Sequence, residues 1–309
     1  MPCYKPLEAW YSKDVNPSGR RGIVFNPSLA LQRDDPINIS CGQCIGCRLE
    51  RSRQWAIRCM HEASLHEENS FITLTFSPEH LVARDNPWSL DVRDWQLFMK
   101  RLRKRTGKKI RFYHCGEYGE LHKRPHYHAC LFGYDFPDKR LWRVVNGQRL
   151  YTSYFLQELW PYGFSTIGTV TFESAAYVAR YIMKKVSGKN ADDYYQWFDD
   201  ETGEIFDRHP EYTTMSRRPG IGRDWIDLYL DDVYPHDYVV VNGKKVRPPK
   251  FYDSVLMLER PYEFDEVKDN RELSGKIFID NNTPERLQVR EAVQQARLNR
   301  LTRGLDSEI

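Results

Sequence analysis

The sequence predicts an α+β protein in which strands joined by hairpins alternate with amphipathic helices. Apolar residues alternate with threonine in Phe71–Phe76, which is the pattern of a strand with one buried face. Ile110–Cys115 and His126–Phe132 are two more apolar segments, and the turn expected between them predicts a hairpin. Apolar residues recur at helical spacing in Ile45–His66 and in Val92–Thr106. This mixture of hairpins and helices is typical of the α+β class.

Composition limits the kind of protein that the chain can be. Its 309 residues are enough for one large domain or two, and a hydrophobic content of 40% can supply a sizeable core. The mean hydropathy is −0.68, and without a run of 18 apolar residues we expect no membrane span. The first residues, Met1–Pro6, lack the apolar centre of a signal peptide, which predicts a cytoplasmic protein. The net charge is only +3, so nucleic-acid binding must be judged from local patches.

The first chemical feature is a cluster of three among the seven cysteines, Cys41, Cys44 and Cys47. In a reducing cell, closely spaced cysteines favour metal binding over disulfides. Structural zinc takes four sulfur or nitrogen ligands, so a fourth is needed. Cys3 is the first choice, because the N-terminal segment can fold back to supply it, and Cys59 and His61 are the alternatives. An iron–sulfur cluster also uses four thiolates, and plain buried thiols need no metal at all.

A basic cluster marks the end of the helix over Val92–Thr106, for which Ser89 or Asp91 is the expected cap and Gly107 the stop. Cations near a helix C-terminus are favourable on dipole grounds alone. The cluster is nearly free of acidic residues, however, which favours contact with nucleic-acid phosphates. Its candidate DNA-binding residues are Arg101, Arg103, Lys104, Arg105, Lys108 and Lys109.

A candidate metal site lies in the predicted hairpin. Side chains alternate between the two faces of a strand, so His126 and His128 share one face, with Tyr127 on the other. The hairpin brings a carboxylate beside them: Glu117, at the strand end, is favoured over Glu120, in the turn. Two imidazoles and a carboxylate suit Mg²⁺ or Mn²⁺ with positions left for phosphate oxygens and water. A bare His-x-His pair is a non-specific signal, and two half-exposed strand histidines are the plain alternative.

A second constellation lies on a later helix. Tyr177 and Tyr181 are four residues apart, which places them on one helix face. Amphipathic packing alone explains such a pair, but the nearby lysines Lys184 and Lys185 argue against simple burial.

The other expected elements complete the chain. A short helix is predicted over Tyr154–Trp160, and a strand over Phe164–Phe172, with Glu173 or Ser174 capping the next helix. Further along we expect a basic, glycine-bearing loop able to hold a phosphate (216–223), an Asn-Gly hairpin (238–246) and a helix beginning at Thr283-Pro284 (283–303). The sequence predicts three domains: a cysteine-rich segment with its helix (1–66), a central domain (67–190) and a mixed C-terminal extension (191–309).

The metal set and the tyrosine pair together have a specific chemical meaning. A tyrosine hydroxyl has a pKa of about 10 and is a poor nucleophile near neutral pH. A metal that polarises a phosphate makes attack feasible, and the resulting tyrosyl–phosphate stores the bond energy for rejoining. A second tyrosine one helical turn away can then start another cycle.

These motifs resemble the replication initiators of the microviruses, small single-stranded DNA bacteriophages, most closely the gokushovirus type within the HUH endonuclease superfamily. The resemblance covers most of the chain, and the two-tyrosine helix is its most specific part. The matching segments are the cysteine cluster, the first strand, the Gly116–Gly119 turn, the Pro125–His128 metal motif and Tyr177–Lys185.

The resemblance implies a central antiparallel sheet of HUH endonuclease type, with the metal strand in its middle and helices on its faces. It implies an enzyme that nicks origin DNA, leaves a 5′-phosphotyrosine, frees a 3′-OH to prime rolling-circle replication and religates the strand. Lys184 or Lys185 would lie near the scissile phosphate. DNA, a host helicase and a host polymerase would be its partners in the bacterial cytoplasm, with no membrane involved.

Two other interpretations remain open from sequence. One is a noncatalytic, zinc-dependent nucleic-acid-binding protein centred on the cysteine cluster. The other is a plasmid initiator, relaxase or transposase of the same superfamily.

Overall fold

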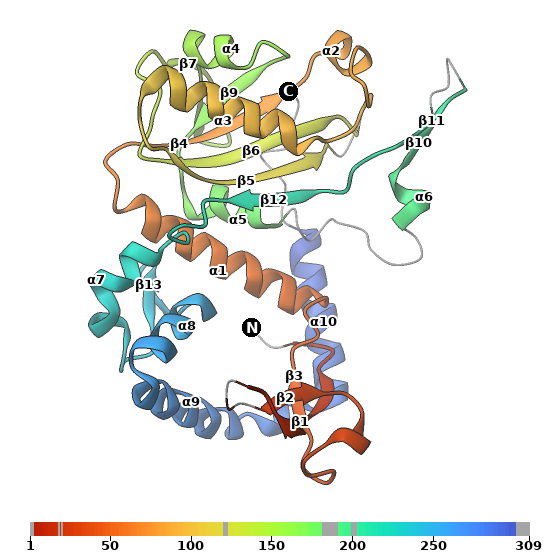
Figure 1. Cartoon of the computed structure of the whole chain (residues 1–309), viewed down its shortest axis with the longest axis vertical. Helices are drawn as coiled ribbons and strands as arrows, with labels where there is room; N and C mark the ends of the chain where they lie inside the picture. The colour runs from red at the N-terminus through yellow and green to blue at the C-terminus, as the bar shows by residue number, and fades with distance from the viewer. Residues whose placement is uncertain are drawn as a thin grey trace. The chain divides into compact units, whose positions relative to one another are not determined.

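The computed structural model describes residues 3–17, 19, 21–119, 123–180, 191–198 and 203–300. The chain divides into two compact units (Figure 1). Met1–Arg51 and Asp269–Thr302 make up the first, and Ser52–Lys268 is the body of the second. Within the described ranges, no helix combines the length and the apolar character needed to cross a bilayer.

The second unit is built on a seven-stranded antiparallel sheet, with the order β12-β5-β6-β4-β9-β8-β7. Its strands are β4 (Asn69–Thr75), β5 (Arg111–Tyr118), β6 (Pro125–Phe132), β7 (Arg140–Val145), β8 (Gln148–Thr152), β9 (Ser165–Gly168) and β12 (Tyr212–Met215). The strand with the two histidines, β6, lies inside the sheet between β5 and β4. The predicted α+β class, with a central antiparallel sheet and flanking helices, is therefore confirmed.

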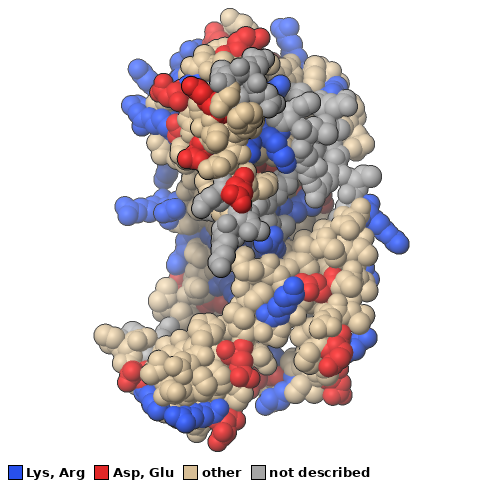
Figure 2. Space-filling view, turned by 90° about the vertical axis from the view of Figure 1, so that its right-hand side faces the viewer, with Lys and Arg blue, Asp and Glu red and all other residues tan. Residues whose placement is uncertain are grey.

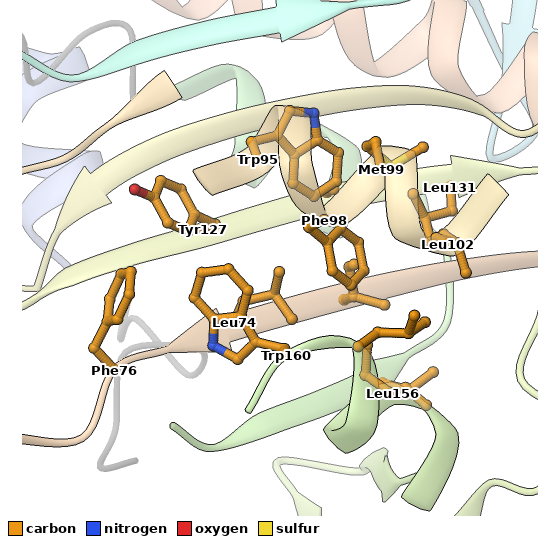
Figure 3. Close-up of a cluster of buried hydrophobic side chains, with 14 of the residues drawn as sticks. Leu74, Phe76, Trp95, Phe98, Met99, Leu102, Tyr127, Leu131, Leu156 and Trp160 are labelled. Atoms are coloured by element: carbon orange, nitrogen blue, oxygen red, sulfur yellow. The ribbon is translucent and has the colours of Figure 1, made fainter. Parts of the chain in front are cut away.

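One face of the sheet is covered by α3 (Val92–Thr106) and α4 (Tyr154–Leu159). Trp95 and Phe98 of α3 pack with Leu74 and Tyr127 of the sheet (Figure 3). Burying each such side chain contributes about 1.5–3 kcal/mol, so this layer is a major source of stability. The helix has the expected ends: the Asp91 side chain accepts from the Arg93 N–H, and Gly107 caps the C-terminus with a φ of 66°.

The opposite face is covered by α5 (Phe172–Arg180) and by α1 (Ile45–Ala63) from Ser52 onward. Small side chains at Ala56, Ala175 and Ala179 are buried there and allow a close approach of helix to sheet. The expected cap of α5 is wrong, because Thr171 takes that role: its hydroxyl accepts from the Ser174 N–H at 3.1 Å. The chain thus leaves β9 earlier than the predicted end at Phe172.

Other helices and hairpins complete the second unit. They are α2 (Pro78–Val82), α6 (Ala191–Tyr195), β10 (Gln196–Phe198), β11 (Ile205–Asp207), α7 (Arg223–Val233), β13 (Val239–Val241), β14 (Lys244–Val246) and α8 (Lys250–Glu259). A further core joins α7 and α8 to Ile57 of α1. The Asn-Gly turn is as predicted, since Asn242 and Gly243 have φ angles of 49° and 74°.

The first unit contains a three-stranded antiparallel sheet of order β2-β1-β3 that the sequence analysis did not anticipate. Its elements are β1 (Leu7–Val15), β2 (Arg21–Val24), η1 (Pro27–Leu29), β3 (Ile37–Ile39), η3 (Ile279–Asn282) and α10 (Pro284–Asn299). The helix α9 (Pro261–Lys276) begins in the second unit and ends in the first. As expected, Pro284 is the first residue of α10; the Thr283 side chain caps it, and the described helix ends at Asn299.

Candidate active site and metal centres

The β5–β6 hairpin places three candidate ligands on one face of the sheet. In its register Glu117 is paired with His126, and Cys115 with His128. Directly paired residues have their side chains on the same face, so Glu117, His126 and His128 share the face covered by α5. Glu120, the alternative carboxylate, lies outside the described residues.

The contacts within this group are short. His128 Nε2 lies 2.7 Å from Glu117 Oε1, and the two side chains are almost fully buried. The His126 and His128 rings are nearly parallel, with centroids 6.4 Å apart. Thr73, paired with His128 across β4 and β6, places its hydroxyl 3.0 Å from His128 Nδ1. The two contacts engage both ring nitrogens and hold the His128 ring in one orientation.

Two glycines make room for this geometry. A Cβ on Gly119 would lie 3.0 Å from His126 Cε1. A Cβ on Gly116 would lie 2.9 Å from the Tyr212 ring on the other face. Near the end of β5, Gly119 therefore makes room for a histidine on one face of the sheet, and Gly116 admits an aromatic ring on the other.

The helix α5 brings Tyr177 into the same group. Its hydroxyl donates to Glu117 Oε1 at 3.2 Å, and its ring meets His128 edge to face with centroids 5.1 Å apart. Tyr177 is buried, so it is held in one orientation. The other three residues proposed for catalysis, Tyr181, Lys184 and Lys185, lie outside the described residues.

By donor chemistry the Glu117, His126 and His128 group fits a divalent cation. It combines imidazole and carboxylate ligands, and the carboxylate already contacts one imidazole. The three are not gathered around one point, however. Over the part of the chain that the structure describes, only the four cysteines form a group whose ligand atoms all lie within 4.8 Å of one another.

The cysteine group consists of Cys3, Cys41, Cys44 and Cys47, and it could hold a metal ion such as zinc. Cys3 Sγ lies 3.5 Å from Cys41 Sγ and 3.8 Å from Cys44 Sγ. The Tyr4 N–H donates to Cys44 Sγ at 3.3 Å. Burial opposes ionisation, but backbone and thiol hydrogen bonds outweigh it and lower the pKa of Cys44 to about 6. Cys44 therefore favours the thiolate, the form that binds metal, whereas burial raises the pKa of Cys3 and raises that of Cys47 to about 12.

The two alternative fourth ligands lie elsewhere. Cys59 is fully buried beneath the large sheet, where burial and the neighbouring Cys130 thiol raise its pKa well above the usual value. His61 stacks on Trp225 with ring centroids 3.5 Å apart. Neither side chain belongs to the cysteine group, so both alternatives were wrong.

Several members of the predicted DNA-binding cluster are engaged by the protein itself. The Arg101 guanidinium donates to Tyr162 Oη, and Arg103 donates to the Ile110 carbonyl. Arg105 pairs with Glu158 at 3.0 Å and Lys108 with Glu68 at 2.9 Å, while Lys104 and Lys109 are exposed. Figure 2 likewise shows positive and negative side chains interspersed on the face that it draws.

Basic side chains line an open pocket of about 440 Å³. The pocket joins the end of α3 to the basic loop that follows β12, two regions far apart in sequence. Its lining residues are Arg103, Lys109, Ile110, Arg111, Phe112, Ser216, Arg217 and Arg218.

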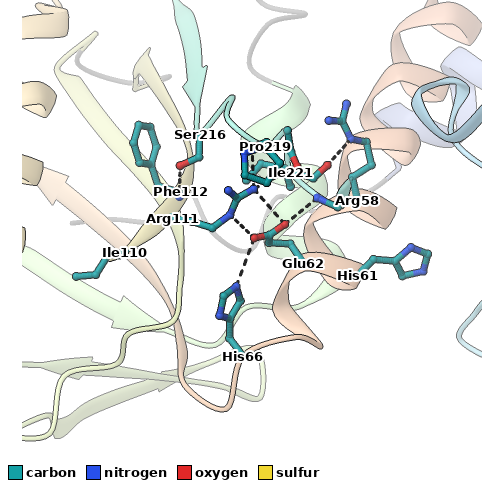
Figure 4. Close-up of polar contacts among 12 residues, drawn as sticks. Arg58, His61, Glu62, His66, Ile110, Arg111, Phe112, Ser216, Pro219 and Ile221 are labelled. Carbon is teal, nitrogen blue, oxygen red and sulfur yellow. Dashed lines mark hydrogen bonds and ion pairs between the residues drawn. The ribbon is translucent and has the colours of Figure 1, made fainter. Parts of the chain in front are cut away.

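A buried ion pair holds that loop in place (Figure 4). The Arg111 guanidinium contacts the Glu62 carboxylate and donates to the carbonyls of Pro219 and Gly220 at 3.1 and 3.2 Å. Glu62 Oε2 also accepts from the Gly222 N–H at 2.7 Å. Local sequence patterns do not indicate this network, because its partners come from α1, β5 and a distant loop.

Thr73 and Gly119 are further contributors that the sequence analysis did not name. Strand periodicity could have indicated Thr73, because it shares a face with Thr75 opposite the apolar Ile72 and Leu74. Gly119 carried a weaker signal, as the second glycine of the Gly116–Gly119 motif.

Comparison with known proteins gives consistent results. The family model described as "Replication-associated protein ORF2/G2P" matches residues 69–186. The replication-associated protein VP4 of Bdellovibrio phage phiMH2K is 32% identical over 290 residues, which cover 91% of this chain and 85% of that protein.

Two further relatives are the replication-associated proteins ORF2 of Spiroplasma virus 4 and ORF4 of Chlamydia phage 1. The first is 33% identical, covering 77% of this chain and 74% of that protein. The second is 31% identical, covering 74% of this chain and 56% of that protein. The comparison with solved structures gives no match.

Proposed function

Because the chain belongs to the replication-associated proteins of the microviruses, we propose that it is the endonuclease that initiates rolling-circle replication. The observation that supports this activity most directly is the contact chain from Tyr177 to Glu117 to His128. It joins a candidate nucleophile to candidate metal ligands on one face of the central hairpin.

In the proposed reaction, Tyr177 Oη attacks a DNA phosphate. The Oη–P bond forms, the P–O3′ bond breaks, and the product is a 5′-phosphotyrosine with a free 3′-OH. The Tyr177 hydroxyl already donates to Glu117 Oε1, so the carboxylate orients the nucleophile and offers a site for its proton. Thr73 fixes the His128 ring beside them.

Glu117, His126 and His128 would hold Mg²⁺ or Mn²⁺. When bound, the cation would neutralise charge on the scissile phosphate, so that a tyrosine hydroxyl, a poor nucleophile, could attack the phosphorus. Tyr181 would be the second nucleophile for the next cycle, and Lys184 or Lys185 would offset charge near the leaving oxygen. The stored phosphotyrosine bond then lets the 3′-OH rejoin the strand.

The rest of the molecule would serve this activity. The cysteine group would hold a structural zinc ion. The proposed DNA-binding residues are Arg101, Arg103, Lys104, Arg105, Lys108 and Lys109. Arg105 and Lys108 have carboxylate partners, which favours Lys104 and Lys109 for direct phosphate contact. Host helicase and polymerase would act at the freed 3′ end in the bacterial cytoplasm.

The proposed activity is tested by formation of a covalent adduct. The protein is incubated with labelled single-stranded origin DNA, with and without Mn²⁺, and analysed by denaturing electrophoresis. We expect a Mn²⁺-dependent adduct that disappears in the Tyr177→Phe/Tyr181→Phe double variant, because no hydroxyl remains to attack. Tyr262→Phe is the matched control, since Tyr262 is 86% exposed and distant in sequence from the site.

An adduct that persists in the double variant would contradict the assignment of the nucleophiles. If the wild-type protein retains the DNA in native gels and forms no adduct with a randomised oligonucleotide pool, the noncatalytic zinc-dependent alternative is supported instead.

A further inference from the structure

We propose that Trp142 and Phe164 form a stacking platform for a base of single-stranded DNA close to the scissile phosphate. This inference rests on the proposed function, because it supplies the substrate strand with a second point of contact beside the catalytic group.

The two rings lie together at the edge of the large sheet. Trp142 comes from β7 and Phe164 directly precedes β9, and their ring centroids are 4.8 Å apart at an angle of 61°. Trp142 is 40% exposed although it is a large aromatic residue. The Arg143 guanidinium lies 4.1 Å from the centroid of the Trp142 ring. Proteins hold unpaired bases by stacking them on aromatic side chains, and arginine adds cation–π contacts at such sites.

The platform lies on the same face and at the same end of the sheet as the catalytic group. Thr75 is paired with His126 across β4 and β6. The Phe164 carbonyl accepts from both the N–H and the hydroxyl of Thr75, at 2.9 and 2.8 Å. Phe164 therefore continues the ladder opposite Thr75, and its side chain shares the face of Thr75 and His126.

The spacing suits a continuous DNA strand. Phe164 is two strand spacings from His126, or roughly 10 Å. At about 3.4 Å per nucleotide in a stacked strand, that distance corresponds to roughly three nucleotides. A strand cleaved at the catalytic group could thus place a nearby base on the platform.

Charge favours nucleic acid over an apolar protein partner. The β7–β8 hairpin, residues 140–152, carries Arg140, Arg143 and Arg149 and has no aspartate or glutamate. Three arginines in a hairpin whose sequence contains no acidic residue, beside the exposed Trp142 ring, are complementary to a phosphate backbone with exposed bases. The plain alternative is that Trp142 only covers the edge of the sheet, in which case its loss would affect stability but not DNA binding.

The first experiment measures binding of labelled single-stranded origin DNA by fluorescence anisotropy, with chelator present so that no cleavage contributes. We expect Trp142→Ala to weaken binding about 10-fold, within the range reported for base–aromatic stacking. Trp142→Phe should recover most of the affinity, because it keeps an aromatic face. Leu141→Ala is the control: Leu141 is 56% exposed and adjacent in the chain, but it pairs with Tyr151, which packs in the core on the opposite face of the sheet.

The salt dependence separates stacking from charge. The slope of log K against log salt should be unchanged in Trp142→Ala, because no phosphate contact is lost. Arg143→Gln should reduce the slope by about 0.7 if its guanidinium also meets a phosphate.

A second experiment changes the DNA rather than the protein. Single abasic sites are placed at successive positions around the nick. The platform predicts one position, within roughly three nucleotides of the nick, where the abasic site weakens wild-type binding and has little further effect on Trp142→Ala. Wild-type affinity in Trp142→Ala, or equal and additive abasic effects in both proteins, would overturn the proposal.

The outcomes are distinguishable from those that test the proposed function. An adduct with no effect of Trp142→Ala on binding refutes the platform and leaves the nuclease intact. A Trp142-dependent abasic effect without an adduct supports the platform in a noncatalytic protein.

Discussion

Glu117 is the residue on which the proposed active site converges. It contacts His128, accepts from Tyr177 and lies opposite His126 in the hairpin register. Alternation along a strand predicted that the histidines share a face, but it left two carboxylates open. The hairpin register places Glu117 beside His126, and its role as a metal ligand is part of the proposed function.

His61 shows how burial suppresses a charge at a single residue. Burial lowers its pKa to about 4, below the usual value of 6.5. His61 Nδ1 lies 2.8 Å from Tyr252 Oη, and its ring stacks on Trp225. The packing therefore favours the neutral ring in the folded state.

The pH dependence of stability should follow from this shift. Between pH 6.5 and 4 the unfolded chain binds a proton at His61 that the folded chain does not, so stability falls as the pH falls through this window. At pH 5 the loss should be about 2 kcal/mol. Thermal unfolding followed by circular dichroism at pH 7 and pH 5 should show a smaller pH-induced drop in His61→Gln than in the wild type.

His236→Gln is the control, because His236 is exposed. This variant should lose as much stability between pH 7 and pH 5 as the wild type does. If His61→Gln and the wild type lose equal stability on acidification, His61 is not the residue responsible.

Among the elements, α1 provides more than a helical cover for the sheet. Its Glu62 anchors the loop after β12 through Arg111 and the Gly222 N–H. Arg111 lies two residues after the predicted DNA-binding cluster in the sequence, yet it is only 7% exposed and serves this network. A basic residue in a charged sequence cluster is thus not always available to a ligand.

Replacing Glu62 should destabilise the second unit strongly. Glu62→Gln leaves the buried Arg111 without its carboxylate, and breaking a buried pair from one side costs about 3–5 kcal/mol. Urea denaturation should show a correspondingly lower free energy of unfolding. Glu67→Gln is the control, because Glu67 is an exposed residue close by in the sequence. Its free energy of unfolding should stay within about 0.5 kcal/mol of the wild-type value. Equal midpoints for the two variants would show that the pair contributes little.

For the molecule as a whole, the two ends of the chain build one unit. Cys3, the Cys41–Cys47 segment and Leu287 of α10 lie in one small cluster. Only three hydrophobic residues are buried in it, Tyr4, Cys44 and Leu287. A bound metal would therefore add stability where the apolar core is small.

Metal content tests this role directly. Purified protein should retain about one zinc ion per chain after dialysis, measured by mass spectrometry, because four thiolates make a closed tetrahedral site. Cys44→Ser should lose the metal, and Cys59→Ala should keep it, because Cys59 lies outside the cysteine group. Iron in place of zinc would support the iron–sulfur alternative, and zinc retained by Cys44→Ser would place the metal elsewhere.

Residues after 190 contribute to the second unit. β12, from the predicted C-terminal extension, pairs with β5, and α7 and α8 pack on Ile57. The predicted domain boundaries at residues 66 and 190 remain predictions, and unfolding studies of truncated chains can test them.

The sequence by itself determined the features that depend on local periodicity and turn chemistry. These include the α+β class, the ends of α3, the Asn-Gly hairpin and the shared face of His126 and His128. Each follows from residues within a few positions of one another, where backbone geometry dictates which side chains lie together.

Only the tertiary structure decided which distant segments meet. It placed Cys3 with the other three thiols, Arg105 against Glu158, Arg111 against Glu62, and Trp142 on Phe164. These contacts depend on how helices and strands pack, and packing is set by the shapes of buried surfaces that no local pattern contains. The contacts that could not be predicted from the sequence are therefore those between residues far apart in the chain, whatever the chemistry of their side chains.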